Sequence, residues 1–354
     1  MKTSSFILAV VVAAFLFMSC EKDDDYNVKH YRGAYIVNEG SFGNNNGSVG
    51  FFDTDSNKMY NNVFYRANNR PLGDVVQSIS VDDNNAYIVV NGSAKLEIVD
   101  LESFEAVTNP LYFNYPRYFL PVGNNEGFLT TGSMEGKIYV INVASFNVVD
   151  SVTVGYGPEN MLLLNDKVYV VNSGGWGLDS TISVVDIASR TVTDTIVVGE
   201  VPVDLVSDAD ENIWVQCKGY AIYDWSTMAL LSETDAKIVK INSSTGEVIK
   251  SAVIGKAGDY AYTAVRMAVN KEGTMIYYLT PDGIFAVGKN DQELPLQPLI
   301  QGSFYGLEIN PATGDIFAFE TNFSGSGLLK IYSSAGVLSE TFEAGVAPSS
   351  GVFF

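Results

Sequence analysis

Residues 168–205 read VYVVNSGGWGLDSTISVVDIASRTVTDTIVVGEVPVDL, and this order of segments recurs through the chain. Short runs of Val, Ile, Tyr and Thr are typical of β-strands, and here they alternate with turns rich in Gly, Asn, Asp and Ser. Three strands are expected at VYVV, ISVVD and TVTDTIVVG, with a fourth after Pro202. The same pattern can be followed from Ala34 to the last residue.

The repeat is counted most easily at the turn residue that ends each third strand. Successive copies are Asp53, Asp100, Asn142, Asp186 and Asn242, with weaker copies at Gly288 and Ser333. The intervals are 47, 42, 44, 56, 46 and 45 residues. A period of about 40–50 residues with four short strands per unit is typical of a β-propeller. The sequence therefore predicts an all-β, seven-bladed propeller.

The two ends of the chain are predicted to close the ring. Residues 347–354 (APSSGVFF) resemble the inner-strand openings at Pro158 and Pro202, whereas the first blade has no such strand before Ala34. We therefore expect the C-terminus to supply the innermost strand of blade one, so that no strand edge remains unpaired there.

The blades resemble the YVTN-type propeller repeat, in which a strand ending in Tyr-Val-x-Asn precedes a V-x-V-I-D strand. The match is clear in blades two to four, partial in blade five and degenerate in blades six and seven. This resemblance implies the same propeller fold with four-stranded blades.

The N-terminal segment reads as a targeting signal. Residues 1–19 combine Lys2 with an apolar run too short to span a membrane stably, and LFMSC at 16–20 resembles a bacterial lipobox ending at Cys20. Residues 20–32 are predicted to be a lipidated cysteine and an acidic tether, followed by the propeller at 33–354. A plain secretion signal and a merely solvated charged run are the alternatives. The run after Cys20 resembles the export signal of surface lipoproteins in the Bacteroidetes, which implies a surface-exposed outer-membrane protein.

Composition argues against several functions. The net charge of −20 disfavours nucleic acid and anionic membrane surfaces as partners. The only histidine, His30, lies in the predicted tether, so Ser-His-Asp and Cys-His triads are disfavoured. The motif DTDSN at 53–57 lacks the glycine and glutamate of a calcium loop, and no metal or cofactor is expected. We predict a protein that is not an enzyme, although a two-carboxylate glycosidase stays open.

Binding is predicted on the face where the loops between second and third strands meet those between blades. These loops carry aromatic rings, amides and a few arginines, which suit a bulky, partly planar ligand rich in amides or hydroxyls. Each aromatic could equally fill a blade interface, and strand-end asparagines also serve turns. The predicted binding residues are Asn38, Phe42, Arg66, Asn91, Tyr115, Arg117, Tyr156, Asn172, Trp176, Tyr220, Tyr223, Trp225, Tyr260, Phe304, Tyr305 and Phe323.

The 56-residue interval contains an insertion, KGYAIYDWSTMALLSETD at 218–235. A long loop on a rigid repeat scaffold is often functional. This segment is the strongest local candidate, the alternative being a flap that packs on the neighbouring blade.

The lipobox, the acidic tether and the opening AYIVNEGSFGNNNGSVGFFD at 34–53 resemble the surface-layer-type propeller lipoproteins of gut Bacteroidetes. One branch of that group is similar to the cobamide-binding BtuG family. The resemblance implies capture of cobamides (vitamin B12) for a TonB-dependent transporter, with the cobamide as ligand rather than cofactor. A surface module that binds protein or glycan is the main alternative, and a carbohydrate hydrolase or lyase is a third.

Overall fold

The computed structural model describes residues 33–354 except 225 and 262. The predicted signal peptide at 1–19, the lipid attachment at Cys20, the tether at 20–32 and the ligand candidate Trp225 lie outside the described residues. Among the residues that are described, no helix is long and apolar enough to cross a membrane.

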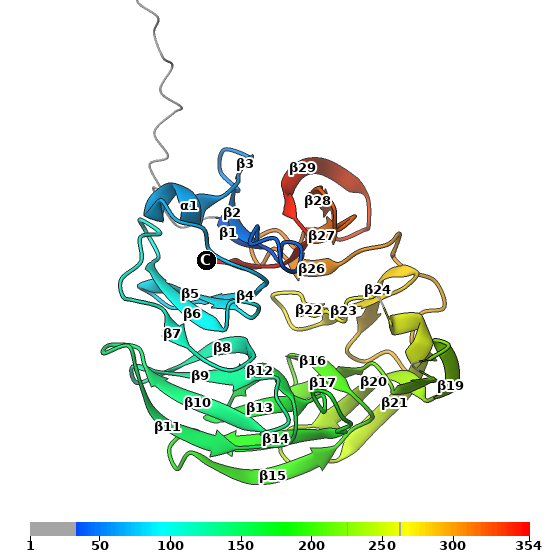
Figure 1. Cartoon of the computed structure of the whole chain (residues 1–354). Coiled ribbons are helices and arrows are strands. Elements are labelled where there is room, and N and C mark those ends of the chain that lie inside the picture. The colour runs from blue at the N-terminus through cyan, green and yellow to red at the C-terminus, as the bar shows by residue number, and fades with distance from the viewer. Residues whose placement is uncertain (1–32, 225, 262) are drawn as a thin grey trace, which may run out of the picture.

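Seven four-stranded antiparallel sheets surround a central axis in chain order, which confirms the predicted seven-bladed propeller (Figure 1). The strands of each blade are given from the innermost outward. Blade one contains β30 (Pro348–Phe353), β1 (Gly33–Asn38), β2 (Ser48–Asp53) and β3 (Lys58–Tyr60), and blade two contains β4 (Val76–Val81), β5 (Asn85–Val90), β6 (Lys95–Asp100) and β7 (Leu111–Tyr112). Blade three contains β8 (Pro116–Gly123), β9 (Glu126–Thr131), β10 (Lys137–Asn142) and β11 (Asn147–Thr153), and blade four contains β12 (Pro158–Leu164), β13 (Lys167–Asn172), β14 (Thr181–Asp186) and β15 (Thr191–Val197). Blade five contains β16 (Pro202–Ser207), β17 (Asn212–Cys217), β20 (Asp235–Asn242) and β21 (Val248–Lys256). Blade six contains β22 (Met267–Val269), β23 (Met275–Thr280), β24 (Gly283–Gly288) and β25 (Ile300–Gln301). Blade seven contains β26 (Gly306–Ile309), β27 (Ile316–Glu320), β28 (Ser326–Tyr332) and β29 (Leu338–Val346).

The C-terminus closes the ring as predicted. Strand β30 pairs antiparallel with β1 in the first sheet, with Ala34 opposite Phe353 and Tyr35 opposite Val352. The ring of Phe354 stacks on Tyr35 with centroids 4.6 Å apart. The first blade is therefore built from both ends of the propeller.

The turn residue that ends each third strand acts through its own side chain. Asp100 Oδ1 accepts hydrogen bonds from the backbone N–H of Glu102 (3.1 Å) and of Ser103 (2.8 Å). Asp53 and Asn142 bind the residues that follow them in the same way. This arrangement is the Asx turn expected for such residues, and it confirms that DTDSN at 53–57 forms a turn.

The core lies between neighbouring blades, because each sheet presents apolar side chains on both faces. Trp214 on β17 packs with Ile276 and Tyr278 on β23 of the next blade, and all three are almost fully buried. Cys217, at the end of β17, is also buried.

Three features depart from the repeat. The insertion in blade five forms a hairpin of β18 (Ala221–Asp224) and β19 (Ala229–Glu233), which pair with each other and not with the blade. A short helix, α1 (Val63–Asn68), lies in the crossover between blades one and two. A 3₁₀ turn, η1 (Ala257–Tyr260), follows β21 and contacts the hairpin strand β19.

Candidate functional site

The innermost strands begin with irregularities that hold polar side chains near the axis. The pairing of β4, β8 and β12 with their neighbours shifts register around Gln77, Arg117 and Glu159 respectively. Such β-bulges bend a strand and re-aim its side chains. Arg117 donates from Nη1 to Gln77 Oε1 (2.5 Å) and from Nε to Glu159 Oε2 (2.7 Å). Three successive blades are thereby linked through one guanidinium.

Arg266, just before β22, lies on the other side of the axis. Its Nη1 donates to the carbonyl oxygen of Val265 (3.0 Å) and, at 3.4 Å, to the hydroxyl of Tyr118. Its Nε reaches the carbonyl oxygen of Ser349 on β30 at 3.4 Å. In the described part of the chain, no carboxylate lies within ion-pair distance of Arg266. Burial would lower the pKa of Arg266, but the nearby Tyr118, Asp204 and Glu39 raise it, so the guanidinium stays charged beside the axis.

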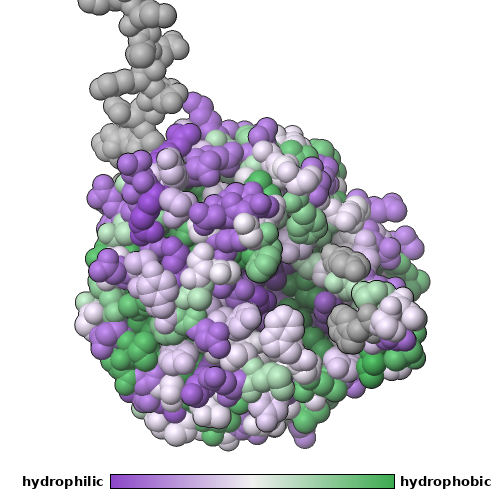
Figure 2. All heavy atoms as spheres, viewed as in Figure 1, coloured by the Kyte–Doolittle hydropathy of each residue, from purple (hydrophilic) through white to green (hydrophobic). Residues whose placement is uncertain are grey.

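A cavity of about 510 Å³ opens above these residues, and we call it the channel mouth. Four ionisable side chains of both signs line it, together with Tyr305, Phe323 and Asn91. Figure 2 shows the ring hollowed near its centre. The ionisable residues of the lining are Glu39, Arg117, Lys218 and Arg266.

Basic side chains outnumber acidic ones in the lining of the channel mouth, and burial shifts the pKa of several of these groups. Burial raises the pKa of Glu39, against the opposing effects of Arg266 and of the hydroxyl of Tyr305, which donates to Glu39 Oε2 (2.9 Å). Burial lowers the pKa of Lys218. Burial also disfavours the charged form of Arg117, but Glu159, Tyr118 and Glu39 together outweigh it and raise the pKa of Arg117. In a chain with a net charge of −20, three cations around one cavity are a local exception.

Two carboxyl groups lie deeper in the channel. Asp204 on β16 accepts hydrogen bonds from the backbone N–H of Met267 (2.8 Å) and Leu205 (2.9 Å), and burial raises its pKa. Burial raises the pKa of Glu308 on β26 to about 8, although the N–H of Gly351 donates to it. A largely protonated Glu308 leaves the positive charge of Arg266 less compensated at neutral pH.

The raised pKa of Glu308 predicts a pH dependence of stability. The folded protein holds a proton up to about pH 8, whereas the unfolded chain releases it near 4.5, the ordinary pKa of a glutamate side chain. The free energy of unfolding should therefore fall as the pH rises between these values. Glu308→Gln cannot ionise and should flatten this decline by up to about 1.4 kcal/mol per pH unit. Urea unfolding of wild type and Glu308→Gln at about pH 5 and about pH 8 measures how the free energy of unfolding of each protein changes with pH. An equal change in both proteins would contradict a raised pKa of Glu308.

Two of the predicted aromatic residues line the channel mouth, and others are exposed elsewhere on the loops. Tyr305 and Phe323 line it and meet edge to face, with centroids 4.9 Å apart. Tyr115 and Trp176 form a second edge-to-face pair at 6.4 Å, and the Trp176 side chain is 80% exposed. Phe42, also in a loop of this face, is 86% exposed. The second pair, Phe42 and half-exposed Tyr156 on the loop before β12 do not belong to the lining of the cavity itself.

The predicted asparagines have structural roles. Asn38 is fully buried, donating to Ser48 Oγ (3.2 Å) and accepting from the N–H of Gly345 (2.9 Å). Asn172 is equally buried and donates to the hydroxyls of Thr181 and Ser183, each at 3.0 Å. Asn91 lines the channel mouth, but its amide donates to the carbonyl of Pro116 in the next blade (2.9 Å). These amides tie strand ends together, and the prediction that Asn38 and Asn172 face a ligand is wrong.

Two aromatic predictions are also wrong. Tyr260 is buried against Ala236 and Val265, and Phe304 is buried in the cluster between blades six and seven. Both residues follow the ends of strands, as predicted, but their side chains pack against apolar residues of neighbouring strands.

The remaining candidates lie outside the lining of the channel mouth. Arg66 is exposed on α1, and Tyr220 and Tyr223 are partly buried at the base of the blade-five hairpin and on β18. The insertion nevertheless contributes Lys218 to the lining.

Sequence reasoning missed Glu39, Lys218 and Arg266. Glu39 directly follows the β1 strand and lies inside a predicted loop. Arg266 precedes β22 at the position where Arg117 and Glu159 open their strands. A polar residue at the start of an inner strand was the available signal, but blade six lacks the proline that marks this point at Pro116 and Pro158.

Comparisons with known proteins agree with the fold. Residues 32–337 match the family model described as a domain of unknown function (DUF5074). No curated protein matches the sequence. A quinonprotein alcohol dehydrogenase-like protein from Bacteroides thetaiotaomicron is 17% identical, with a TM-score of 0.68 over 92% of this chain and 79% of that one.

Two further structures are similar at this level. Hydrazine synthase from Kuenenia stuttgartiensis has a TM-score of 0.58 and 15% identity over 79% of this chain and 92% of that chain. The WD40 domain of Neurospora crassa Pan2 has a TM-score of 0.56 and 12% identity over 82% of each chain. At such low identity these matches support the propeller fold alone.

Proposed function

Because the chain belongs to the DUF5074 family, we propose from the geometry of its own loop face that it is a ligand-binding propeller whose site is the channel mouth. The observation that carries this proposal is Arg266, a cation that lies deep in the channel, faces the cavity and has no carboxylate contact in the described residues. Burying a charge is costly, and Asp204 and Glu39 reduce that cost only from beyond ion-pair distance. A ligand oxygen at Arg266 would offset that cost.

The lining defines the class of ligand. Arg117, Lys218 and Arg266 offer donors to carbonyl, carboxylate or phosphate oxygens. The ring faces of Phe323, Tyr115 and Trp176 offer apolar contact around the opening. A bulky small molecule that combines many amide oxygens with an acidic group and a flat apolar body fits this arrangement.

Within this class, a cobamide is the ligand we propose first. It carries amide side chains around a broad ring and one phosphodiester. The choice rests on the resemblance to the BtuG family, and the donors and rings of the channel mouth are compatible with it. Capture at the cell surface for a TonB-dependent transporter is the corresponding biological role.

Calorimetric titration with cyanocobalamin tests this proposal. We expect a saturable one-to-one heat, and Trp176→Ala should weaken binding about tenfold, since an aromatic contact contributes of the order of 1 kcal/mol. Tyr112→Ala is the matched control, because Tyr112 is 73% exposed on the outer strand β7. No heat and no co-elution with cyanocobalamin would remove the cobamide proposal. Equal loss in both variants would place the ligand elsewhere.

A further inference from the structure

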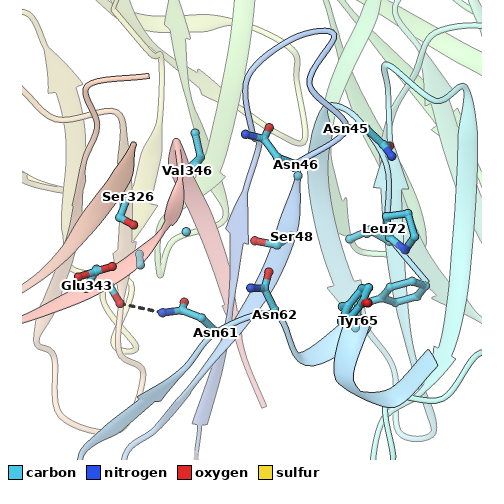
Figure 3. Close-up of a pocket in the computed structure, with 15 residues that line it drawn as sticks. Asn45, Asn46, Ser48, Asn61, Asn62, Tyr65, Leu72, Ser326, Glu343 and Val346 are labelled. Carbon is cyan, nitrogen blue, oxygen red and sulfur yellow. Dashed lines mark hydrogen bonds between the residues drawn. The ribbon is translucent and has the colours of Figure 1, made fainter. Parts of the chain in front are cut away.

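A second cavity of about 530 Å³ lies on the loop face where the ring closes, and we call it the seam pocket. Its walls come from the loop between β1 and β2, the crossover that contains α1, and the ends of β28 and β29 in blade seven (Figure 3). The crossover helix α1 is the only α-helix in the described part of the chain. The seam pocket is thus formed by a departure from the blade repeat.

The seam pocket is separate from the channel mouth. Glu39 lines the channel mouth, whereas Asn45–Ser48 of the same loop line the seam pocket. The loop is held at both sides: Ser41 Oγ donates to the carbonyl of Phe323 (2.8 Å), and the N–H of Gly43 donates to Asp74. One ordered loop therefore divides the two cavities.

Amides dominate the polar lining of the seam pocket. Asn61 donates to the carbonyl oxygen of Glu343 (3.2 Å), and Asn46 accepts from the N–H of Ser41 (2.8 Å) through Oδ1. Asn62 stands at the N-cap position of α1, yet its side chain makes no capping hydrogen bond. Asn62 and Ser48 both belong to the lining of the pocket (Figure 3). The Asn46 and Asn62 side chains thus retain donors and acceptors for a bound molecule.

An apolar surface lies beside these amides. The ring of Tyr65 on α1 is 54% exposed at the pocket, and Leu72 and Phe64 are buried at its wall. A half-exposed ring next to hydrogen-bonding groups suits a ligand with one flat apolar face and polar edges.

The charge of its lining distinguishes the seam pocket from the channel mouth. Of the 15 residues drawn at the pocket, Glu343 is the only Asp, Glu, Lys or Arg. Without a cation in the lining, an anionic ligand would meet only the repulsion of Glu343. The lining therefore disfavours an anion, and its many amides and hydroxyl groups suit a neutral polar molecule.

We propose that the seam pocket binds a neutral saccharide. Amide side chains can both donate to and accept from ring hydroxyls, and Tyr65 offers a surface for the C–H face of a pyranose ring. This site is independent of the proposed ligand at the channel mouth, and it gives the protein a second specificity.

Saturation-transfer NMR of the purified protein with methyl glucoside, methyl galactoside, methyl mannoside and N-acetylglucosamine tests this site. At least one of these sugars should bind, and glucuronic acid and glucose phosphate should bind more weakly. Tyr65→Ala and Asn62→Gly should each weaken binding about tenfold, because each removes one ring contact or one hydrogen-bonding group. Glycine tolerates the positive φ of 60° at position 62, so this variant removes the amide without straining the backbone. Tyr65→Phe should keep the binding.

Four outcomes would overturn the proposal: no transfer to any of the neutral sugars, stronger binding of the charged ones, binding unaffected by both variants, or loss of binding in Arg266→Gln. The last result would place the sugar in the channel mouth. Binding of the neutral sugar in the presence and absence of cyanocobalamin distinguishes the two sites, because occupation of one should leave the other open.

Discussion

Deletion of residues 347–354 is expected to abolish cooperative folding of the entire ring. The deletion removes β30, which pairs with β1 and supplies the innermost strand of the first blade. It also removes Phe353, whose ring packs edge to face on Phe317 of blade seven at 4.9 Å, and the carbonyl of Ala347, which accepts from the N–H of Glu39 (2.9 Å). Blades one and seven then lose part of their shared contacts, and β1 becomes an open edge.

Urea unfolding followed by tryptophan fluorescence and circular dichroism measures this effect. The truncated chain should show no cooperative transition or form aggregates. Val337→Ala serves as a control, because Val337 is 65% exposed in a turn of blade seven, and its stability should stay within about 0.5 kcal/mol of wild type. A truncated protein that unfolds cooperatively at the wild-type midpoint would show that the ring does not depend on β30.

Asp208→Ala should cause the largest loss of stability among single substitutions at polar residues, about 3–5 kcal/mol. The Asp208 side chain is fully buried and pairs with Lys240 Nζ at 2.8 Å, while the indole N–H of Trp214 donates to it at 3.0 Å. Burial would raise the pKa of Asp208, but the hydrogen bonds from Lys240 and Trp214 outweigh it and hold that pKa below its usual value. Alanine leaves the ammonium group of Lys240 almost buried without a counter-charge.

The midpoint of thermal or urea unfolding reports this loss. Asp55→Ala is the matched control at an exposed aspartate, where the change should stay within about 0.5 kcal/mol. Asp208→Asn keeps the shape and one acceptor, so it should fall between wild type and Asp208→Ala. Equal stability of the Asp55 and Asp208 alanine variants would contradict the role assigned to this ion pair.

The architecture could be predicted from the sequence because each repeat forms its strands and turns through interactions between residues that are close in the sequence. Asp100 and Asn142 form their turns from neighbouring residues alone, and alternation along strands such as β13 follows from the pleat. Ring closure could also be predicted, because the residues after Ala347 repeat the openings at Pro158 and Pro202. These signals need no knowledge of contacts between distant blades.

The site could be predicted only in outline. The loop face and the residues Arg117, Tyr305 and Phe323 were expected, but Asn172 and Tyr260 are buried by contacts that a loop assignment does not reveal. Arg266 and Glu39, 227 positions apart in numbering, line one cavity because the ring brings strand ends to a common axis. Such convergence depends on tertiary geometry, and so does the pKa of Glu308, which reflects burial in the channel.

The most direct test of the proposed site compares cyanocobalamin binding by wild type, Arg266→Gln and Arg66→Gln in parallel titrations. Both variants lose one guanidinium, but Arg66 is exposed on α1 and Arg266 lies in the channel mouth. Loss of a charge-assisted hydrogen bond should weaken binding to Arg266→Gln about ten- to hundredfold, while Arg66→Gln should bind as wild type does. Unchanged affinity in a folded Arg266→Gln protein, or an equal loss in both variants, would contradict a ligand site at the channel mouth.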